Sequence, residues 1–222
     1  MSTSVGLFSS SLGRKILMAI TGLFLCSFLI VHLVGNLALF YSPDDFNMYT
    51  RFMSTNGMIR IAEIILFLGI IVHAVDAVML TRANRKARPV KYAMDKKRST
   101  WVSRNMGITG SLVLAFIIIH LNTFLVTYKF GEVGQVMIEG EQVKDMYDVV
   151  VKAFGIKYYS AGYVIALLIL GMHLNHGFQS AFQSLGLNHK RYTPGIKMAG
   201  KLFAILITIG FVAFPIYFGF IK

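Results

Sequence analysis

Five long apolar runs dominate this sequence. They cover approximately 16–40, 59–81, 105–127, 159–183 and 199–221. Each is about long enough to cross a bilayer as a helix, at roughly 1.5 Å of rise per residue. Backbone groups inside lipid must be satisfied within their own segment, so these runs are expected to be helices. The sequence therefore predicts an all-α integral membrane protein, with residues 1–222 forming a single transmembrane domain of five bundled helices.

The composition favours the same class. Hydrophobic residues make up 55% of the chain and charged residues 14%, whereas a soluble domain carries about 25% charged residues. The single cysteine, Cys26, lies inside an apolar run. One cysteine excludes an internal disulfide and a cysteine-ligated iron–sulfur cluster within this chain.

Basic residues alternate between the connections. The N-terminal segment carries Arg14 and Lys15, and nine basic residues lie between Arg82 and Arg104. The fourth connection adds Lys190, Arg191, Lys197 and Lys201, while the first and third mix acids and bases. By the positive-inside rule the N-terminus is cytoplasmic and the C-terminus outside. The net charge of +12 is thus a topology signal, which can also serve to dock an acidic partner, and does not indicate nucleic-acid binding.

Five of the six histidines fall within the first four apolar runs: His32, His73, His120, His173 and His176. His32 lies 17 residues after Lys15 and His120 lies 16 after Arg104, which puts both roughly 25 Å from the cytoplasmic boundary. His73 precedes Arg82 by nine residues, or roughly 14 Å. The histidines therefore form two layers, an outer one on helices one and three and an inner one on helices two and four.

Two layers of paired imidazoles in a four-helix core suit two haems, each with both axial positions taken. Zinc would need four ligands converging at about 2 Å, which two separate layers do not supply. A proton-coupled transporter using His and Asp does not explain the pairing by depth, and a structural tether explains neither layer. Three glycines near the histidines, Gly35, Gly69 and Gly177, could provide a flat wall for a porphyrin or serve ordinary close helix packing.

Several local motifs, taken in order, carry a family resemblance. They are Gly13-Arg14-Lys15 leading to Met18-Ala19-Ile20-Thr21-Gly22, then His32-Leu33-Val34-Gly35-Asn36, His73, His120 and Met172-His173-Leu174-Asn175-His176-Gly177. With the helix count and topology, this set resembles the cytochrome b558 membrane-anchor subunit of succinate:quinone oxidoreductases (succinate dehydrogenase and fumarate reductase), of the single-anchor, five-helix, di-haem type. The resemblance covers nearly the whole chain.

The resemblance implies two haem b groups in the bundle. His32 and His120 would bind the outer haem, and His73 and His173 the inner one, with His176 as the alternative to His173. It implies no FAD or iron–sulfur cluster in this chain. Succinate chemistry would take place on a flavoprotein subunit, joined through an iron–sulfur subunit to the cytoplasmic face of the bacterial inner membrane. Electrons would pass to a membrane quinone, expected to be menaquinone.

Other interpretations remain open. The chain could be the di-haem subunit of another respiratory complex, such as a nitrate reductase or hydrogenase, or a haem-free transporter. Candidate quinone or propionate contacts are Glu63, Asp76, Trp101, Ser103 and Arg104. Asp76 is the one clearly intramembrane acid, which is a functional candidate by default. Glu63 could instead be an ordinary carboxylate at the membrane interface. Trp101 and Arg104 could instead be an aromatic-belt tryptophan and a positive-inside arginine.

Overall fold

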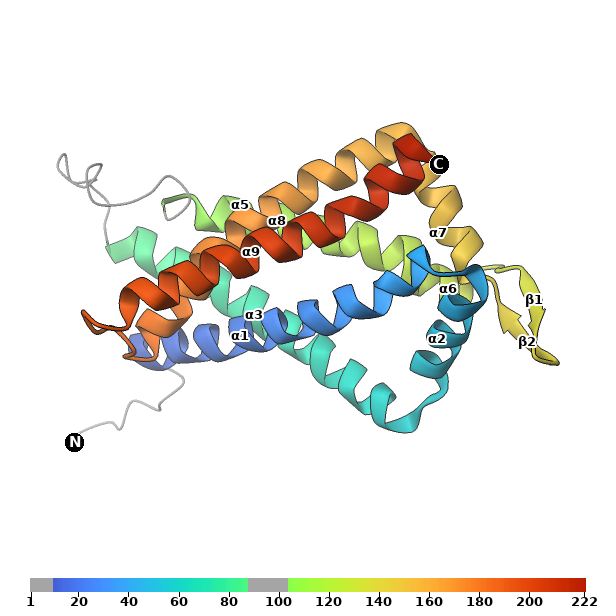
Figure 1. Cartoon of the computed structure of the whole chain (residues 1–222). Coiled ribbons are helices and arrows are strands. Elements are labelled where there is room, and N and C mark those ends of the chain that lie inside the picture. Colours follow the sequence, from blue (N-terminus) through green and yellow to red (C-terminus); the bar gives the residue numbers. More distant parts are fainter. Residues whose placement is uncertain (1–9, 88–103) are drawn as a thin grey trace.

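The computed structural model describes residues 10–87 and 104–222. Within them, five helices are long and apolar enough to cross a membrane: Ser11–Phe40, Gly57–Lys86, Met106–Phe130, Lys157–Ser184 and Thr193–Ile221. The chain is a multi-pass membrane protein. The first helix begins and the last one ends at opposite ends of the bundle (Figure 1), as an odd number of crossings requires.

The spans are built from regular helices with short additions. The main helices are α1 (Ser11–Asn36), α3 (Gly57–Ala87), α5 (Met106–His120), α8 (Lys157–Ser184) and α9 (Thr193–Ile216). The shorter elements are η1 (Leu37–Phe40), α2 (Pro43–Thr55), the π-helix η3 (Leu121–Val126), α6 (Thr127–Phe130), β1 (Gln135–Ile138), β2 (Glu141–Lys144), α7 (Met146–Gly155) and the π-helix η4 (Tyr217–Ile221).

Two helices extend beyond the apolar runs. The second run ends near 81, but α3 continues to Ala87 with Arg85 and Lys86 in its last turn. Basic side chains there are favoured by the negative end of the helix dipole. Helix α9 begins six residues before the predicted 199, at Thr193, with a proline in its first turn. Proline suits that position because its missing N–H would have no helical partner.

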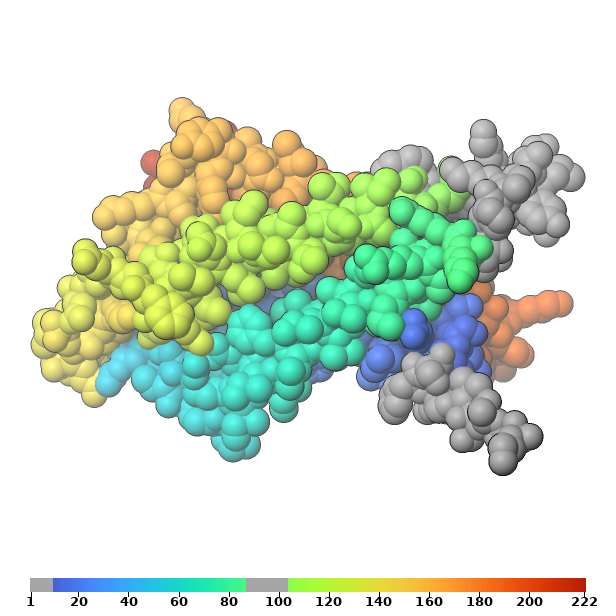
Figure 2. Space-filling model, turned by 180° about the vertical axis from the view of Figure 1, so that it is seen from behind, coloured from blue at the N-terminus to red at the C-terminus, as the bar shows by residue number. Residues whose placement is uncertain are grey.

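Four of the long helices form a closed ring. α1 packs against α3, α3 against α5, α5 against α8, and α8 against α1, while α9 lies along α8 and also touches α1. α1 and α5 are therefore diagonal across the ring, as are α3 and α8. Figure 2 shows α3 and α5 on one face, with the surface hollowed between them near the middle of the bundle. Side chains from diagonal helices can meet in this interior.

A folded cap covers one end of the bundle. It consists of α2, the β1–β2 hairpin and α7 (Figure 1). The strands are antiparallel, with Val136 opposite Val143. Their two-residue turn has φ of 50° at Glu139 and 82° at Gly140, which is the type I′ geometry that fits the strand twist. This hairpin is the one sheet among the described residues of an otherwise helical fold.

Asn47 ties the two helices of the cap together. It is 2% exposed. Its Nδ2 donates to Asp145 Oδ1 at 3.0 Å, and its Oδ1 accepts from the Tyr147 backbone N–H at 2.9 Å. The same Asp145 oxygen accepts from the Asp148 N–H at 3.1 Å and so caps α7. One buried amide therefore fixes α2 against the start of α7.

Replacing Asn47 with alanine should destabilise the cap by about 2–4 kcal/mol, because two buried hydrogen bonds are lost and one of them is to a carboxylate. The measurement is the melting temperature in detergent, together with the rate of protease cleavage within 131–146. Thr55→Ala is the matched control, since Thr55 is exposed at the end of the same helix. Equal melting temperatures for the two variants would contradict this role for Asn47.

Candidate functional site

The outer histidines meet across the ring. His32 comes from α1 and His120 is the last residue of α5. Their ring centroids lie 5.6 Å apart with the planes nearly perpendicular, at 88°. The predicted association of these two residues, 88 positions apart in the sequence, is thus present in the structure.

Aromatic side chains enclose this outer pair. Phe28 stacks on His32 at 5.2 Å between centroids, and Phe211 of α9 lies 5.6 Å from the same ring. Phe124 lies 5.3 Å from the His120 ring. Apolar rings on both sides keep water away from the imidazoles and lower the local dielectric.

Each outer imidazole is contacted at its Nδ1 atom. His120 Nδ1 lies 2.5 Å from the hydroxyl of Tyr163, which projects from α8 and is buried. His32 Nδ1 lies 3.4 Å from Asn36 Nδ2, whose other hydrogen is donated to the His32 carbonyl at 2.7 Å. The Tyr163 hydroxyl can accept the Nδ1 proton of His120, which leaves Nε2 as the nitrogen that can bind a metal. The Asn36 amide nitrogen is a donor, so its contact uses the Nδ1 lone pair of His32 and only orients that ring.

The inner histidines also come from diagonal helices. His73 lies on α3 and His173 on α8, the other two helices of the ring. Thr21 of α1 fixes the state of His73. The single hydroxyl proton of Thr21 is donated to the Leu17 carbonyl at 2.9 Å, so its 3.0 Å contact with His73 Nδ1 must be donated by the histidine. That tautomer leaves Nε2 with a free lone pair, as a metal ligand requires.

Glycines lie directly beside the inner rings. A Cβ added at Gly22 of α1 would lie 3.4 Å from His73 Cε1, and one added at Gly110 of α5 would lie 3.5 Å from His173 Cε1. Each inner ring therefore lies against bare backbone of a neighbouring helix. Within the described residues the buried Nδ1 of His173 has no hydrogen-bond partner.

The glycines singled out in the sequence have other neighbours. Gly35 lies against the Tyr49 hydroxyl, Gly69 against the Phe24 ring and Gly177 against the methyl group of Met106. They allow close packing of helices, which was the alternative explanation for them.

The polar candidates are scattered. Glu63 forms ion pairs with Arg60 and with Lys129, the latter at 2.5 Å, and so joins α3 to α6. Asp76 is buried and lines a pocket between α1 and α3. Arg104 lies just before the start of α5, whereas Trp101 and Ser103 fall outside the described residues.

Three contributions to the site have no clear signal in the sequence. Thr21 lies in the Met18–Gly22 segment, where a threonine has no distinctive spacing to His73, and Tyr163 precedes His173 by ten residues without any pattern linking them. The π-helix η3 follows His120 immediately. Such π segments are frequent at functional sites, because the extra residue per turn redirects side chains.

The donor set fits a cofactor that takes two axial nitrogens. A metal–imidazole bond is about 2 Å long, so two rings on one metal would have centroids roughly 6 Å apart; the outer pair is at 5.6 Å. In the described ranges, no group of three or more His, Cys, Asp and Glu side chains converges. Comparison of the chain with protein-family models, characterised proteins and solved structures found no match.

Proposed function

We propose that this chain is the di-haem cytochrome b membrane anchor of a succinate:quinone oxidoreductase, passing electrons between an iron–sulfur subunit and a membrane quinone. The observation that carries this proposal is the pair of imidazoles, His32 and His120, 5.6 Å apart across a closed ring of four helices. His73 and His173, on the other two helices of the same ring, are the proposed second pair.

The residues present would hold the two haems as follows. His32 and His120 bind the outer haem, and His73 and His173 the inner one. A haem with both axial positions filled supplies one-electron transfer without an open site for oxygen chemistry. Tyr163 and Thr21 hold their imidazoles at Nδ1, so Nε2 is the nitrogen that would bind iron. The surrounding phenylalanines exclude water from the outer pair.

The basic end of the bundle is the proposed docking face. Its exposed side chains include Arg82, Arg85, Lys86, Lys190, Arg191, Lys197 and Lys201. The described part of the chain has no acid at this end. An iron–sulfur subunit with an acidic surface would be attracted to this face, and the flavoprotein subunit would bind beyond it. This orientation puts the basic end in the cytoplasm and the cap outside the bacterial inner membrane.

The purified chain should contain two low-spin b haems per polypeptide. The measurement is haem-to-polypeptide stoichiometry, combined with a reduced-minus-oxidised spectrum. One haem would show that one histidine layer is structural. A folded but colourless protein would contradict the proposal and favour a transporter that uses the buried Asp76. Copurifying flavoprotein and iron–sulfur subunits would separate this function from that of a di-haem subunit in another respiratory complex.

A further inference from the structure

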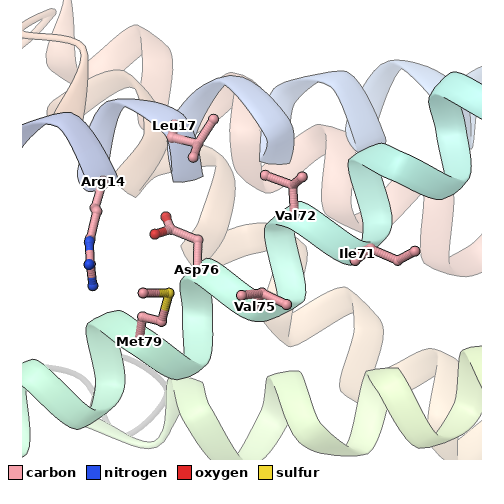
Figure 3. Close-up of a pocket in the computed structure, with 7 residues that line it drawn as sticks. All are labelled: Arg14, Leu17, Ile71, Val72, Val75, Asp76 and Met79. Carbon is pink, nitrogen blue, oxygen red and sulfur yellow. The ribbon is translucent and has the colours of Figure 1, made fainter. Parts of the chain in front are cut away.

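A pocket of about 310 Å³ lies between α1 and α3 toward the basic end of the bundle (Figure 3). Most of its wall is apolar: Leu17 of α1, and Ile71, Val72, Val75 and Met79 of α3. Its volume is at the lower end of the range for small-molecule sites. Because both helices belong to the membrane spans, a ligand of this pocket would be one that partitions into the bilayer.

The pocket also contains a buried acid, Asp76. Asp76 is 5% exposed, and its Oδ2 has no hydrogen-bond partner in the part of the chain that the structure describes. Figure 3 shows its carboxylate directed from α3 toward α1. A buried polar group without a hydrogen bond costs free energy, and more so when it is ionised. Asp76 is therefore a group whose partner would be a bound molecule.

Arg14 adds a positive charge to the wall of the same pocket. Its side chain reaches from α1 along the pocket wall (Figure 3). Among the described residues it forms no direct ion pair with Asp76. The pocket thus offers a hydrogen-bond acceptor and a cationic donor at separate points of an apolar wall. A ligand that uses both needs a donor, an acceptor and an apolar body.

We propose that this pocket binds the head group of a membrane hydroquinone. Asp76 accepts a hydrogen bond from one ring hydroxyl, and Arg14 donates to the oxygen on the opposite side of the ring. A phosphate-headed lipid would be repelled by Asp76, and a metal cation would be repelled by Arg14. The inference rests on the proposed function, which supplies the quinone as reaction partner.

The position of the pocket suits this role. Asp76 follows His73 by three residues, which is about 4.5 Å of rise along α3. The carbonyl of Leu17, another pocket residue, accepts the proton of the Thr21 hydroxyl that contacts His73. A hydroquinone here would lie beside the inner histidine pair. The rival candidate Glu63 is less suitable, because its carboxylate is already paired with Arg60 and Lys129.

Photolabelling can locate the site. The complete complex would be irradiated with an azido-1,4-naphthoquinone in its reduced form, and the labelled peptides mapped. Label is expected in segments 14–17 and 71–79. Asp76→Leu should lower it about tenfold and Asp76→Asn about threefold, since a hydrogen bond to a charged acceptor is stronger than one to a neutral amide. Glu63→Gln is the matched control and should leave labelling of these segments unchanged.

Three results would overturn the inference: label concentrated around 60–63 or on α5 and α8, label unaffected by both Asp76 variants, or label displaced by phospholipid and not by unlabelled naphthoquinol. Haem spectra of the same samples separate the two proposals. Labelled protein without haem would refute the proposed function and leave the pocket standing. Haem-loaded protein without label in these segments would refute the pocket alone. If Asp76→Leu fails to fold, Asp76→Asn decides the outcome.

Discussion

Replacing His32 or His120 with alanine should remove one of the two haems, and replacing His73 or His173 should remove the other. In the proposed function each haem depends on two imidazoles from diagonal helices, and alanine would leave one axial position empty in an apolar interior. The expected haem content is one per chain in each variant, measured from the haem-to-polypeptide ratio. The remaining haem should have one spectrum in the His32 and His120 variants and a different one in the His73 and His173 variants.

The two other histidines are internal controls. His176→Ala and His189→Ala should keep both haems, because His189 is exposed in the basic connection and His173 is the ring that lies against Gly110. If His176→Ala lost the inner haem and His173→Ala kept it, His176 would be the ligand and His173 would not. If the His32 and His73 variants lost the same haem, the division into two layers would be wrong.

Thr21→Val should weaken inner haem binding by about 10–100-fold, the usual effect of removing the group that orients a metal ligand. Valine has nearly the same shape as threonine but cannot accept the Nδ1 proton of His73, which at present lies 3.0 Å from the hydroxyl. The measurement is haem release to apomyoglobin, followed separately for the two haems by their spectra. The midpoint potential of the inner haem should shift in the same sample.

Thr21→Ser is the matched control, because it keeps the hydroxyl and loses only a methyl group. It should bind the inner haem as the wild type does. A merely structural role for Thr21 would produce the opposite order, with valine tolerated and serine not. Equal release of both haems in Thr21→Val would also count against a specific action on His73.

The membrane spans and the common depth of His32 and His120 were predictable because both depend only on distances along the sequence. Apolar length defines a membrane helix, and the rise per residue gives depth, which placed His32 and His120 in one layer. The choice between His173 and His176 was not settled in this way. The two side chains differ more in their angular position around α8 than in depth. Which of them faces the interior depends on the neighbouring helices, and His173 lies beside Gly110 of α5.

The cap could not be predicted from the same quantities. Asn47 and Asp145 are 98 residues apart and neither belongs to an apolar pattern, so nothing local links them. The hairpin carried a turn signal at Glu139-Gly140, but its strands are only four residues each. The π-helix after His120 was not predictable either, because it interrupts an apolar run that reads as one continuous helix.

The π segment η3 separates two parts of the third span that contact different neighbours. This separation bears on how the protein tolerates insertions and deletions there. Upstream of η3 the helix is aligned to α8, through His120 and Tyr163. Downstream it is aligned to α2 and α3, through Tyr128 with Ser54 and Lys129 with Glu63. A π-helical turn holds one residue more than an α-helical turn, and one residue corresponds to about 100° of rotation, so η3 changes how the second half faces relative to the first. The third span is thus two independently aligned half-helices, and the length of 121–126 determines whether both can reach their neighbours at once.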